Sequence, residues 1–308
     1  MILRYEHLSQ HPKVFQAMTG LRVSEFDELL KDVLPVYLEA EEQRLSHANR
    51  KRAIGAGHPF ELNYGNQILL TVVWLRMYAS HEVLAYLFGS NDSSVSRFIR
   101  RVLPVLEQAG RDTMRMPDPG RKRRRSLDDL LRDTPELAVI IDSFEQRVQR
   151  PQDRKEADSY YSGKKKQHTL KSQIAVDEET GQIVDTSKSV RGPTADINLL
   201  QQSELMTRLP EGVGGLGDLA YVGIEKLHPE GLGASPRRKP RGKARPEEDV
   251  LYNTAFSPRR IIVENTIGRM RRYQSVTQSD RNHRQLHASR VAAIAGLVNR
   301  QIAARMPG

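Results

Sequence analysis

The sequence predicts a helical N-terminal domain followed by a mixed α/β domain, because its hydrophobic periodicity changes partway along the chain. Apolar residues recur at helical spacing over residues 1–115, as in amphipathic helices. After a Pro-, Gly- and Arg-rich stretch, the run LAVIID at 137–142 is continuously apolar and ends in an acid, a pattern typical of a strand buried on both faces. We therefore expect helices over 1–115, a basic linker over 116–135 and an α/β domain over 136–308.

Start and stop signals delimit the N-terminal helices. LRVSEFDELLKDVLPVYLEAEEQRL has helical spacing with Ser24 as its expected N-cap, and NQILLTVVWLRMY is a strongly apolar helix. A helix over 81–88, a four-residue turn from Gly89 to Asp92 and a helix opened by Asp92 or Ser93 follow. This spacing is typical of a helix-turn-helix.

The last of these helices has one apolar face and one polar face. Val95, Phe98, Ile99 and Val102 recur at i, i+3, i+4 and i+7 and should face the core. The candidates for contact with DNA lie on the rest of its surface: Ser94, Ser96, Arg97, Arg100 and Arg101. An αα-hairpin that only packs fits the same pattern, and the charge of the chain favours DNA.

That charge is strongly basic and clustered. Lys and Arg number 48 against 38 Asp and Glu, and much of the excess lies in RKRRR at 121–125 and RRKPRGKAR at 237–245. Clustered positive charge indicates a polyanion partner, because binding phosphates releases condensed counterions. The chain has no cysteine, which excludes disulfides, thiolate zinc sites and cysteine nucleophiles. Its apolar stretches are too short to span a membrane, so we expect a cytoplasmic, nucleoid-associated protein with no membrane partner.

In the C-terminal domain, HTLKSQIAVD at 168–177 and QIVDTSKSV at 182–190 predict a hairpin. Pro193 is expected to open a helix that runs to about Arg208. A glycine-rich segment, a basic loop and two final helices complete the domain.

Three acids are candidates for metal-dependent chemistry. Asp142 ends the first predicted strand, Asp218 follows the glycine-rich segment, and Glu264 is the single acid among five arginines in RRIIVENTIGRMRRY at 259–273. Carboxylates can hold a pair of Mg²⁺ ions about 3.5–4 Å apart, which activate a nucleophile and stabilise a leaving oxygen. Each acid also has a structural explanation, namely a strand-terminal turn, a loop cap or an ion pair with a neighbouring arginine. Spacing alone does not choose between the two readings.

Two other motifs are set aside. GVGGLG at 212–217 lacks the preceding strand of a dinucleotide site, and position 237 is Arg where that site needs an acid. His283 and His287 lie four apart on a predicted helix without a catalytic Glu or an evident third ligand. Packing or phosphate contact is therefore their expected role.

Several segments together carry a family resemblance. EVLAYLFGSNDSSVSRFIRRVLPVLE, IIDSFEQRVQRP, YYSGKKKQHTLKSQIAVD, VRGPTADINLLQQS, GDLAYVGI and SPRRIIVENTIGRMRRY occur in that order. The chain thereby resembles, over nearly its whole length, bacterial DDE transposases of the insertion-sequence-five type, in the harbinger-like DDE superfamily. The resemblance implies a ribonuclease H-like catalytic domain behind a helix-turn-helix domain.

The resemblance also implies roles for particular residues. Asp142, Asp218 and Glu264 match the catalytic, metal-binding acids, with Mg²⁺ as the expected cofactor, Mn²⁺ as a second candidate and no organic cofactor. Residues expected to contact DNA phosphates are Arg260, Arg271, Lys164, Lys165 and Lys166. Three positions depart from the family's pattern. Arg271 stands where the family usually has lysine, and Ser257 stands where tyrosine is common. The residues directly before Asp196 lack the His that the family often has there.

The function implied is that of a DNA transposase. It would bind the terminal inverted repeats of an insertion sequence, cleave phosphodiesters at the ends and join the 3′-OH to target DNA. Because two ends are processed together, a homodimer or larger assembly on double-stranded DNA is expected. The alternatives are a catalytically silent DNA-binding descendant and a metal-dependent endonuclease without strand transfer.

Overall fold

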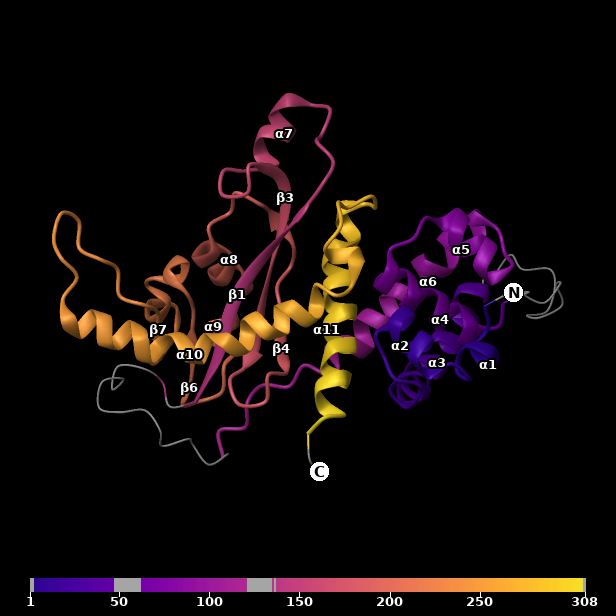
Figure 1. Cartoon of the computed structure of the whole chain (residues 1–308), viewed down its shortest axis with the longest axis horizontal. Coiled ribbons are helices and arrows are strands. Elements are labelled where there is room, and N and C mark those ends of the chain that lie inside the picture. The colour runs from indigo at the N-terminus through magenta and orange to yellow at the C-terminus, as the bar shows by residue number, and fades with distance from the viewer. Residues whose placement is uncertain (1–2, 47–61, 121–134, 136, 307–308) are drawn as a thin grey trace.

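The computed structural model describes residues 3–46, 62–120, 135 and 137–306 of the 308-residue chain. Within these ranges, a helical N-terminal bundle and a sheet-containing domain lie on either side of the C-terminal helix (Figure 1). The RKRRR cluster and residues 121–134 of the expected linker lie outside the described residues. In the part described, no helix is long and apolar enough to cross a lipid bilayer.

The N-terminal domain is helical, as the periodicity predicts. Its helices are α1 (Tyr5–Leu8), α2 (Pro12–Thr19), α3 (Val23–Leu45), α4 (Tyr64–Met77), α5 (His81–Phe88) and α6 (Asp92–Arg111). The N-cap of α3 is Arg22 and not the expected Ser24. The Glu25 side chain accepts the Arg22 backbone N–H at 2.7 Å, so a carboxylate satisfies a donor at the helix start.

The helix-turn-helix prediction is confirmed in α5 and α6. Helix α5 ends at Gly89, whose φ of 57° lies in the left-handed region that glycine tolerates. Asn91 then caps α6, since its Oδ1 accepts the backbone N–H of Ser94 at 2.8 Å. The turn is therefore held by one glycine and one capping side chain.

The C-terminal domain is built on one mixed sheet. Its strands are β1 (Leu137–Arg147), β2 (Tyr161–Ser162), β3 (Gln167–Asp177), β4 (Ile183–Thr186), β5 (Val190–Arg191), β6 (Val213–Leu216) and β7 (Gly233–Ala234). β1 is central, antiparallel to β3 and parallel to β6, and β6 is parallel to β7. β3 pairs on its outer side with β2, β4 and β5. Antiparallel strands on one side of a central strand and parallel strands on the other give the ribonuclease H-like arrangement that the resemblance implies.

One strand boundary differs from the sequence-based expectation, and one strand forms where the sequence indicates only a glycine-rich segment. Asp142 does not end β1, because the antiparallel ladder with β3 continues to the Arg147–Thr169 pair. The continuous apolar run stops at Asp142, but burial continues through Phe144 and Gln146, and backbone pairing does not depend on side-chain polarity. The glycine-rich segment before Asp218 does form a strand, β6, and its glycines allow close packing: a Cβ at Gly215 would lie 2.6 Å from Met206 Sδ.

Helices cover both faces of the sheet. They are α7 (Arg154–Tyr160), α8 (Asp196–Ser203), α9 (Leu205–Arg208), α10 (Glu247–Met270) and α11 (His287–Ala303), with single 3₁₀ turns at Leu219–Tyr221, Ile224–Leu227, Gln274–Val276 and Arg284–Leu286. The helix expected from Pro193 begins only at Asp196 and is interrupted at Glu204, which has a φ of 53°. Ile140 packs on the α10 and α11 side, and Ile141 packs on the α8 and α9 side.

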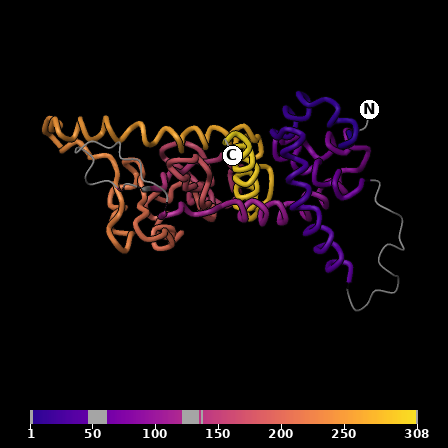
Figure 2. Tube along the Cα trace, turned by 90° about the horizontal axis from the view of Figure 1, so that it is seen from below, coloured from indigo at the N-terminus to yellow at the C-terminus, as the bar shows by residue number. Residues whose placement is uncertain are grey.

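Helix α11 joins the two domains. Figure 2 shows α10 running along one side of the sheet to reach α11, which stands against the helical bundle. Helices α6 and α11 touch backbone to backbone, because a Cβ at Gly296 would overlap the Cα of Gly110. The apolar residues of the bundle, of α11 and of one sheet face form a single core cluster.

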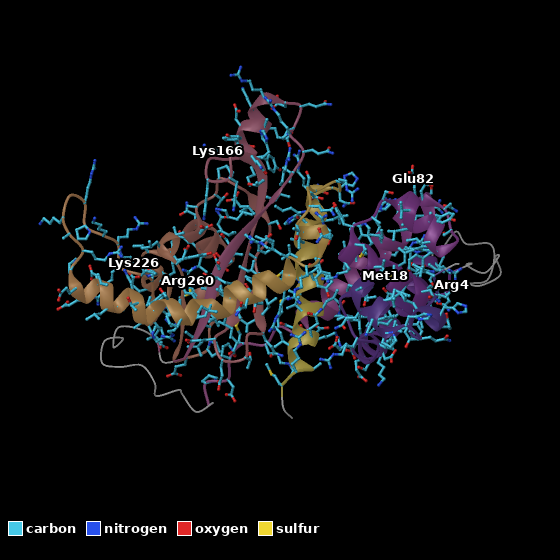
Figure 3. All side chains as sticks on the ribbon, in the orientation of Figure 1. Arg4, Met18, Glu82, Lys166, Lys226 and Arg260 are labelled. Atoms are coloured by element: carbon cyan, nitrogen blue, oxygen red, sulfur yellow. The ribbon has the colours of Figure 1, made fainter. Side chains whose placement is uncertain are left out.

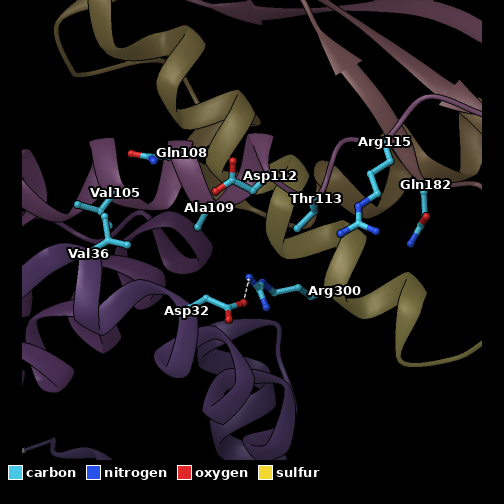
Figure 4. A pocket seen from close by; sticks show the side chains of 10 residues that line it. All are labelled: Asp32, Val36, Val105, Gln108, Ala109, Asp112, Thr113, Arg115, Gln182 and Arg300. Atoms are coloured by element: carbon cyan, nitrogen blue, oxygen red, sulfur yellow. Dashed lines mark hydrogen bonds and ion pairs between the residues drawn. The ribbon is translucent and has the colours of Figure 1, made fainter. Parts of the chain in front are cut away.

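A pocket of about 570 Å³ lies beside this junction, lined by side chains of α3, α6 and α11 (Figure 4). Across it, an ion pair between Arg300 Nη2 and Asp32 Oδ2 spans 2.6 Å. The two domains are therefore joined by polar contacts as well as by the core.

Candidate active site

Parallel pairing of β1 with β6 brings two of the three predicted acids together. Ile140 lies opposite Leu216 in this ladder, and Asp142 and Asp218 each lie two residues further along. The register therefore brings Asp142, within β1, and Asp218, just beyond the end of β6, to the same level of the sheet. Their charges interact, and that of Asp218 acts on Asp142.

Asp142 holds its proton more tightly than an ordinary carboxyl. Burial raises the pKa of Asp142 to about 6, and the charges of Asp218 and Asp196 act in the same direction. The backbone N–H of Ser143, 2.7 Å from Asp142 Oδ1, and the charge of Arg260 lower that pKa and only partly compensate. A buried carboxylate beside a second carboxylate is stabilised in its charged form by a cation.

Glu264 lies on α10, which packs against β1. Its side chain is 58% exposed, and Arg260 Nη2 lies 3.5 Å from its Oε1. The Arg260 charge also acts on Asp142, so this guanidinium belongs to the environments of both acids. The ion pair expected from the sequence is therefore present. In the ranges described, no three acidic or histidine side chains are close enough together to hold a metal ion.

A buried polar group lies next to Asp142, and the sequence-based reasoning did not find it. Ser143 Oγ donates a hydrogen bond to Asp196 Oδ1 at 2.8 Å, and Lys171 Nζ lies 2.8 Å from the same oxygen. The side chains of Lys171 and Asp196 are only 8% and 10% exposed. The available signal was a lysine inside the otherwise buried strand β3, since a buried charge needs a partner.

Tyr221 is buried on the α8 and α9 side of the sheet, where the charges of the acids act on it. Burial raises the pKa of Tyr221 well above its usual value, and the charges of Asp196, Asp142 and Asp218 add to that shift. Its hydroxyl donates to Gln173 Oε1 at 3.2 Å. Burial and the neighbouring carboxylates thereby keep the tyrosine in its neutral form.

The predicted DNA-contact residues of α6 divide into two groups. Arg97 and Arg100 are exposed, and Ser94 and Ser96 are half-buried. The charge of Arg101 is engaged within the bundle, because its Nη1 lies 3.5 Å from Glu41 Oε2. As expected, the apolar face of the helix is buried through Val95, Phe98, Ile99 and Val102.

The remaining predicted basic residues lie on the C-terminal domain. The side chains of Lys164, Lys165 and Lys166 are exposed in the turn before β3, and Figure 3 labels Lys166 far from Arg260. Arg271 is exposed at the C-cap of α10. In the basic loop, Arg238 Nη2 donates to the carbonyl oxygen of Leu219 at 3.0 Å, next to Asp218.

The histidine pair at 283 and 287 does not form a common site. His287 is fully buried, with Nδ1 2.7 Å from Ser189 Oγ and Nε2 2.7 Å from Gln146 Oε1. His283 is exposed. Of the two roles expected from the sequence, packing and phosphate contact, His287 therefore has the packing role.

Comparison with known proteins agrees with this architecture. A family model described as DDE superfamily endonuclease matches residues 141–299, and one described as helix-turn-helix of DDE superfamily endonuclease matches residues 60–112. The chain is 27% identical over 256 residues to a protein of Microchaete diplosiphon named as a probable transposase for insertion sequence element IS702, covering 83% of this chain and 87% of that protein. No solved structure matches the chain significantly.

The first model begins at the strand that carries Asp142 and ends in α11, and the second covers α4, α5 and α6. The matched regions thus include both the paired carboxylates and the helix-turn-helix. The chain belongs to the DDE superfamily of endonucleases.

Proposed function

We propose that this protein is the transposase of an insertion sequence. The observation that carries the proposal is the placement of Asp142 within β1 beside Asp218, which follows the end of the adjacent parallel strand β6, with α10 packed against β1. The named relative and the helix-turn-helix match support it. We further propose the domain limits 1–115, 116–135 and 136–308.

Asp142 and Asp218 are the residues that would hold divalent cations, with Glu264 as the third ligand. Their oxygen donors suit Mg²⁺ or Mn²⁺, and mutual repulsion with burial gives Asp142 a reason to bind a cation. When bound, two such ions supply a nucleophilic oxygen and stabilise the leaving oxygen.

The reaction consists of two in-line displacements at phosphorus. A water oxygen first attacks a phosphodiester at the element's end, and the bond to the 3′ oxygen breaks, which frees a 3′-OH. That hydroxyl then attacks a target phosphodiester, forming one P–O bond as another breaks. Arg260, beside Asp142 and Glu264, would bind the reacting phosphate's oxygens, since guanidinium matches phosphate geometry.

Helix α6 supplies recognition in this proposal. Its exposed Arg97 and Arg100, with Ser94 and Ser96, would contact the terminal inverted repeats in the major groove. Lys164, Lys165, Lys166 and Arg271 would contact backbone phosphates. Two chains would assemble on paired ends. Because the substrate is DNA, the protein would act at the nucleoid.

The first test is Asp142→Asn, assayed on DNA that carries the element's own ends with Mg²⁺. End cleavage is expected to be lost while binding of the ends persists, because the neutral amide cannot hold the cation. A matched control is Asp185→Asn, since Asp185 is also a largely buried carboxyl with a raised pKa but pairs with Arg208 away from the acids. Cleavage by Asp142→Asn at the rate of the control would overturn the assignment.

Strand transfer needs its own assay. Pre-cleaved ends are incubated with a supercoiled plasmid, and joined product is measured. Joining supports the transposase, whereas cleavage in the first assay without any joining identifies a nuclease. Absence of both with intact binding identifies a silent DNA-binding descendant.

A further inference from the structure

A basic pocket lies at the junction of the two domains, and neither a residue of α6 nor any of the three acids lines it. Its volume is about 320 Å³, and its lining includes Lys13, Gln16, Arg76, Arg272, Gln301 and Arg305. We call this the junction cluster. It contains four cations, and no acidic residue lines it.

The members come from four helix ends. Lys13 lies on α2, Arg76 in the last turn of α4, Arg272 two residues beyond α10, and Arg305 two residues beyond α11. Arg76, Arg272 and Arg305 lie at helix C-termini, which carry about half a negative charge each, whereas Lys13 lies in the first turn of α2. Three such ends offset about one and a half of the four cationic charges. A positive excess remains, and helix capping alone does not account for the cluster.

Hydrogen bonding separates one structural arginine from the other three cations. Arg76 Nη1 donates to the carbonyl oxygen of Arg272 at 2.8 Å, and its guanidinium lies 5.4 Å from the centre of the Tyr273 ring. Lys13, Arg272 and Arg305 are exposed. Among the described residues, no carboxylate lies within the 4.0 Å of an ion pair from any of the four cations.

The like charges also act on one another. Burial lowers the pKa of Arg76, and the charge of Arg272 lowers it further. At the end of α10, burial lowers the pKa of Arg269, and the charges of Arg305 and Arg272 add to that shift. Cations held together without a counter-charge repel one another, and a bound polyanion removes that repulsion.

We propose that the junction cluster binds backbone phosphates of double-stranded DNA, as a contact separate from the helix-turn-helix and from the acids. This inference rests on the proposed function only in taking DNA as the substrate. DNA fits better than a small free anion because, in the part of the chain described, the three cations without a hydrogen-bonding role are exposed side chains of three separate segments around the pocket, and a polyanion can contact all three at once. Because its members lie on α2 and just beyond the ends of α10 and α11, the cluster would bind one duplex across both domains.

The test measures the salt dependence of binding to a 30-bp duplex (about three helical turns) of arbitrary sequence. The triple variant Lys13→Gln, Arg272→Gln, Arg305→Gln is compared with the full-length wild type. Each lost phosphate contact lowers the slope of log K against log [NaCl] by about 0.9, so a fall of about 2–3 is expected. The triple Lys31→Gln, Arg111→Gln, Arg208→Gln removes the same charge from cations already paired with Glu28, Glu107 and Asp185, and its slope should fall by less than about one.

Equal slopes of log K against log [NaCl] for the two triple variants would overturn the proposal. Because the three substituted side chains are exposed, the thermal midpoint is expected to stay unchanged. The double variant Arg272→Lys, Arg305→Lys keeps both charges and should keep the wild-type slope of log K against log [NaCl]. A lower slope for this double variant would also contradict a phosphate contact.

The outcome is independent of cleavage. If the junction triple binds with the control's slope while Asp142→Asn loses cleavage, only this inference fails. If the slope of log K against log [NaCl] falls for the junction triple while Asp142→Asn still cleaves, only the catalytic assignment fails.

Discussion

At the scale of single residues, the surroundings of a side chain decide its chemistry here. Asp142 has a pKa of about 6 because burial and neighbouring carboxylates disfavour its charge. Asp280 is also buried, yet its pKa is lowered, because Arg290 donates to it and outweighs the burial that acts the other way. Only the first of these carboxyls lacks a full protein partner, and so only the first is suited to receive a cation.

His287 gives a pH-dependent contribution to stability. Burial lowers the pKa of His287 to about 3, whereas an unfolded histidine titrates near 6.5. Between these values the unfolded chain binds more protons, so the contribution of His287 falls as pH falls, by up to about 1.4 kcal/mol per unit below about 6.5. Denaturant unfolding from pH 7 to 4.5 should show a shallower decline for His287→Asn than for wild type.

The exposed His283 supplies the control for this prediction. His283→Gln should keep the wild-type decline, because the side chain is in solvent. An identical pH slope for all three proteins would show that His287 takes up a proton equally in the folded and unfolded chains, which would contradict the prediction.

At the scale of elements, α6 has a buried packing face and an exposed face that we propose recognises DNA. Substituting both exposed arginines, Arg97→Ala and Arg100→Ala, should reduce preference for the terminal repeats over unrelated DNA, with a cost of about 1–3 kcal/mol for each lost base contact. Competition binding measures that preference. A uniform loss of affinity for every sequence would instead identify these residues as phosphate contacts.

Arg101 is the internal comparison on the same helix. Since its guanidinium lies 3.5 Å from Glu41 Oε2, Arg101→Ala should lower the free energy of unfolding and leave sequence preference unchanged. A loss of preference in this variant would place Arg101 in the groove.

At the scale of the whole molecule, the crossing of α6 and α11 fixes one domain against the other. Buried polar contacts reinforce it: the Tyr78 hydroxyl, from the end of α4, donates to Asp280 Oδ1 at 3.1 Å and accepts the backbone N–H of Arg281 at 2.9 Å. With a core cluster shared between the domains, we expect the described parts to unfold as one unit.

Gly296→Ala tests this coupling. The added methyl group would overlap Gly110, and overpacking of this kind costs about 1–3 kcal/mol. The control Gly268→Ala adds a methyl group on α10 where no atom lies within 4 Å, and should stabilise by up to about 1 kcal/mol. Urea unfolding measures both, and equal effects of the two substitutions would contradict a tight crossing.

Local patterns in the sequence were sufficient for the helices and the central strand. The i, i+3, i+4 spacing in α6, the Gly89 turn and the apolar run at 137–142 each depend on neighbours a few residues away, and the structure has the predicted elements there. Boundaries were less predictable. β1 extends to Arg147 because β3 pairs with it, and β6 forms from glycines because Met206 packs against them.

The amino-acid sequence by itself determined which acids were candidates and that the chain would carry a helix-turn-helix and a large positive charge. Only the tertiary structure decided which acids meet. The parallel register sets Asp142 beside Asp218, and chain folding adds Asp196, Lys171 and the junction cluster. The physical reason is that the interaction of charges depends on distance and burial, and residues far apart in sequence acquire both only when the chain folds.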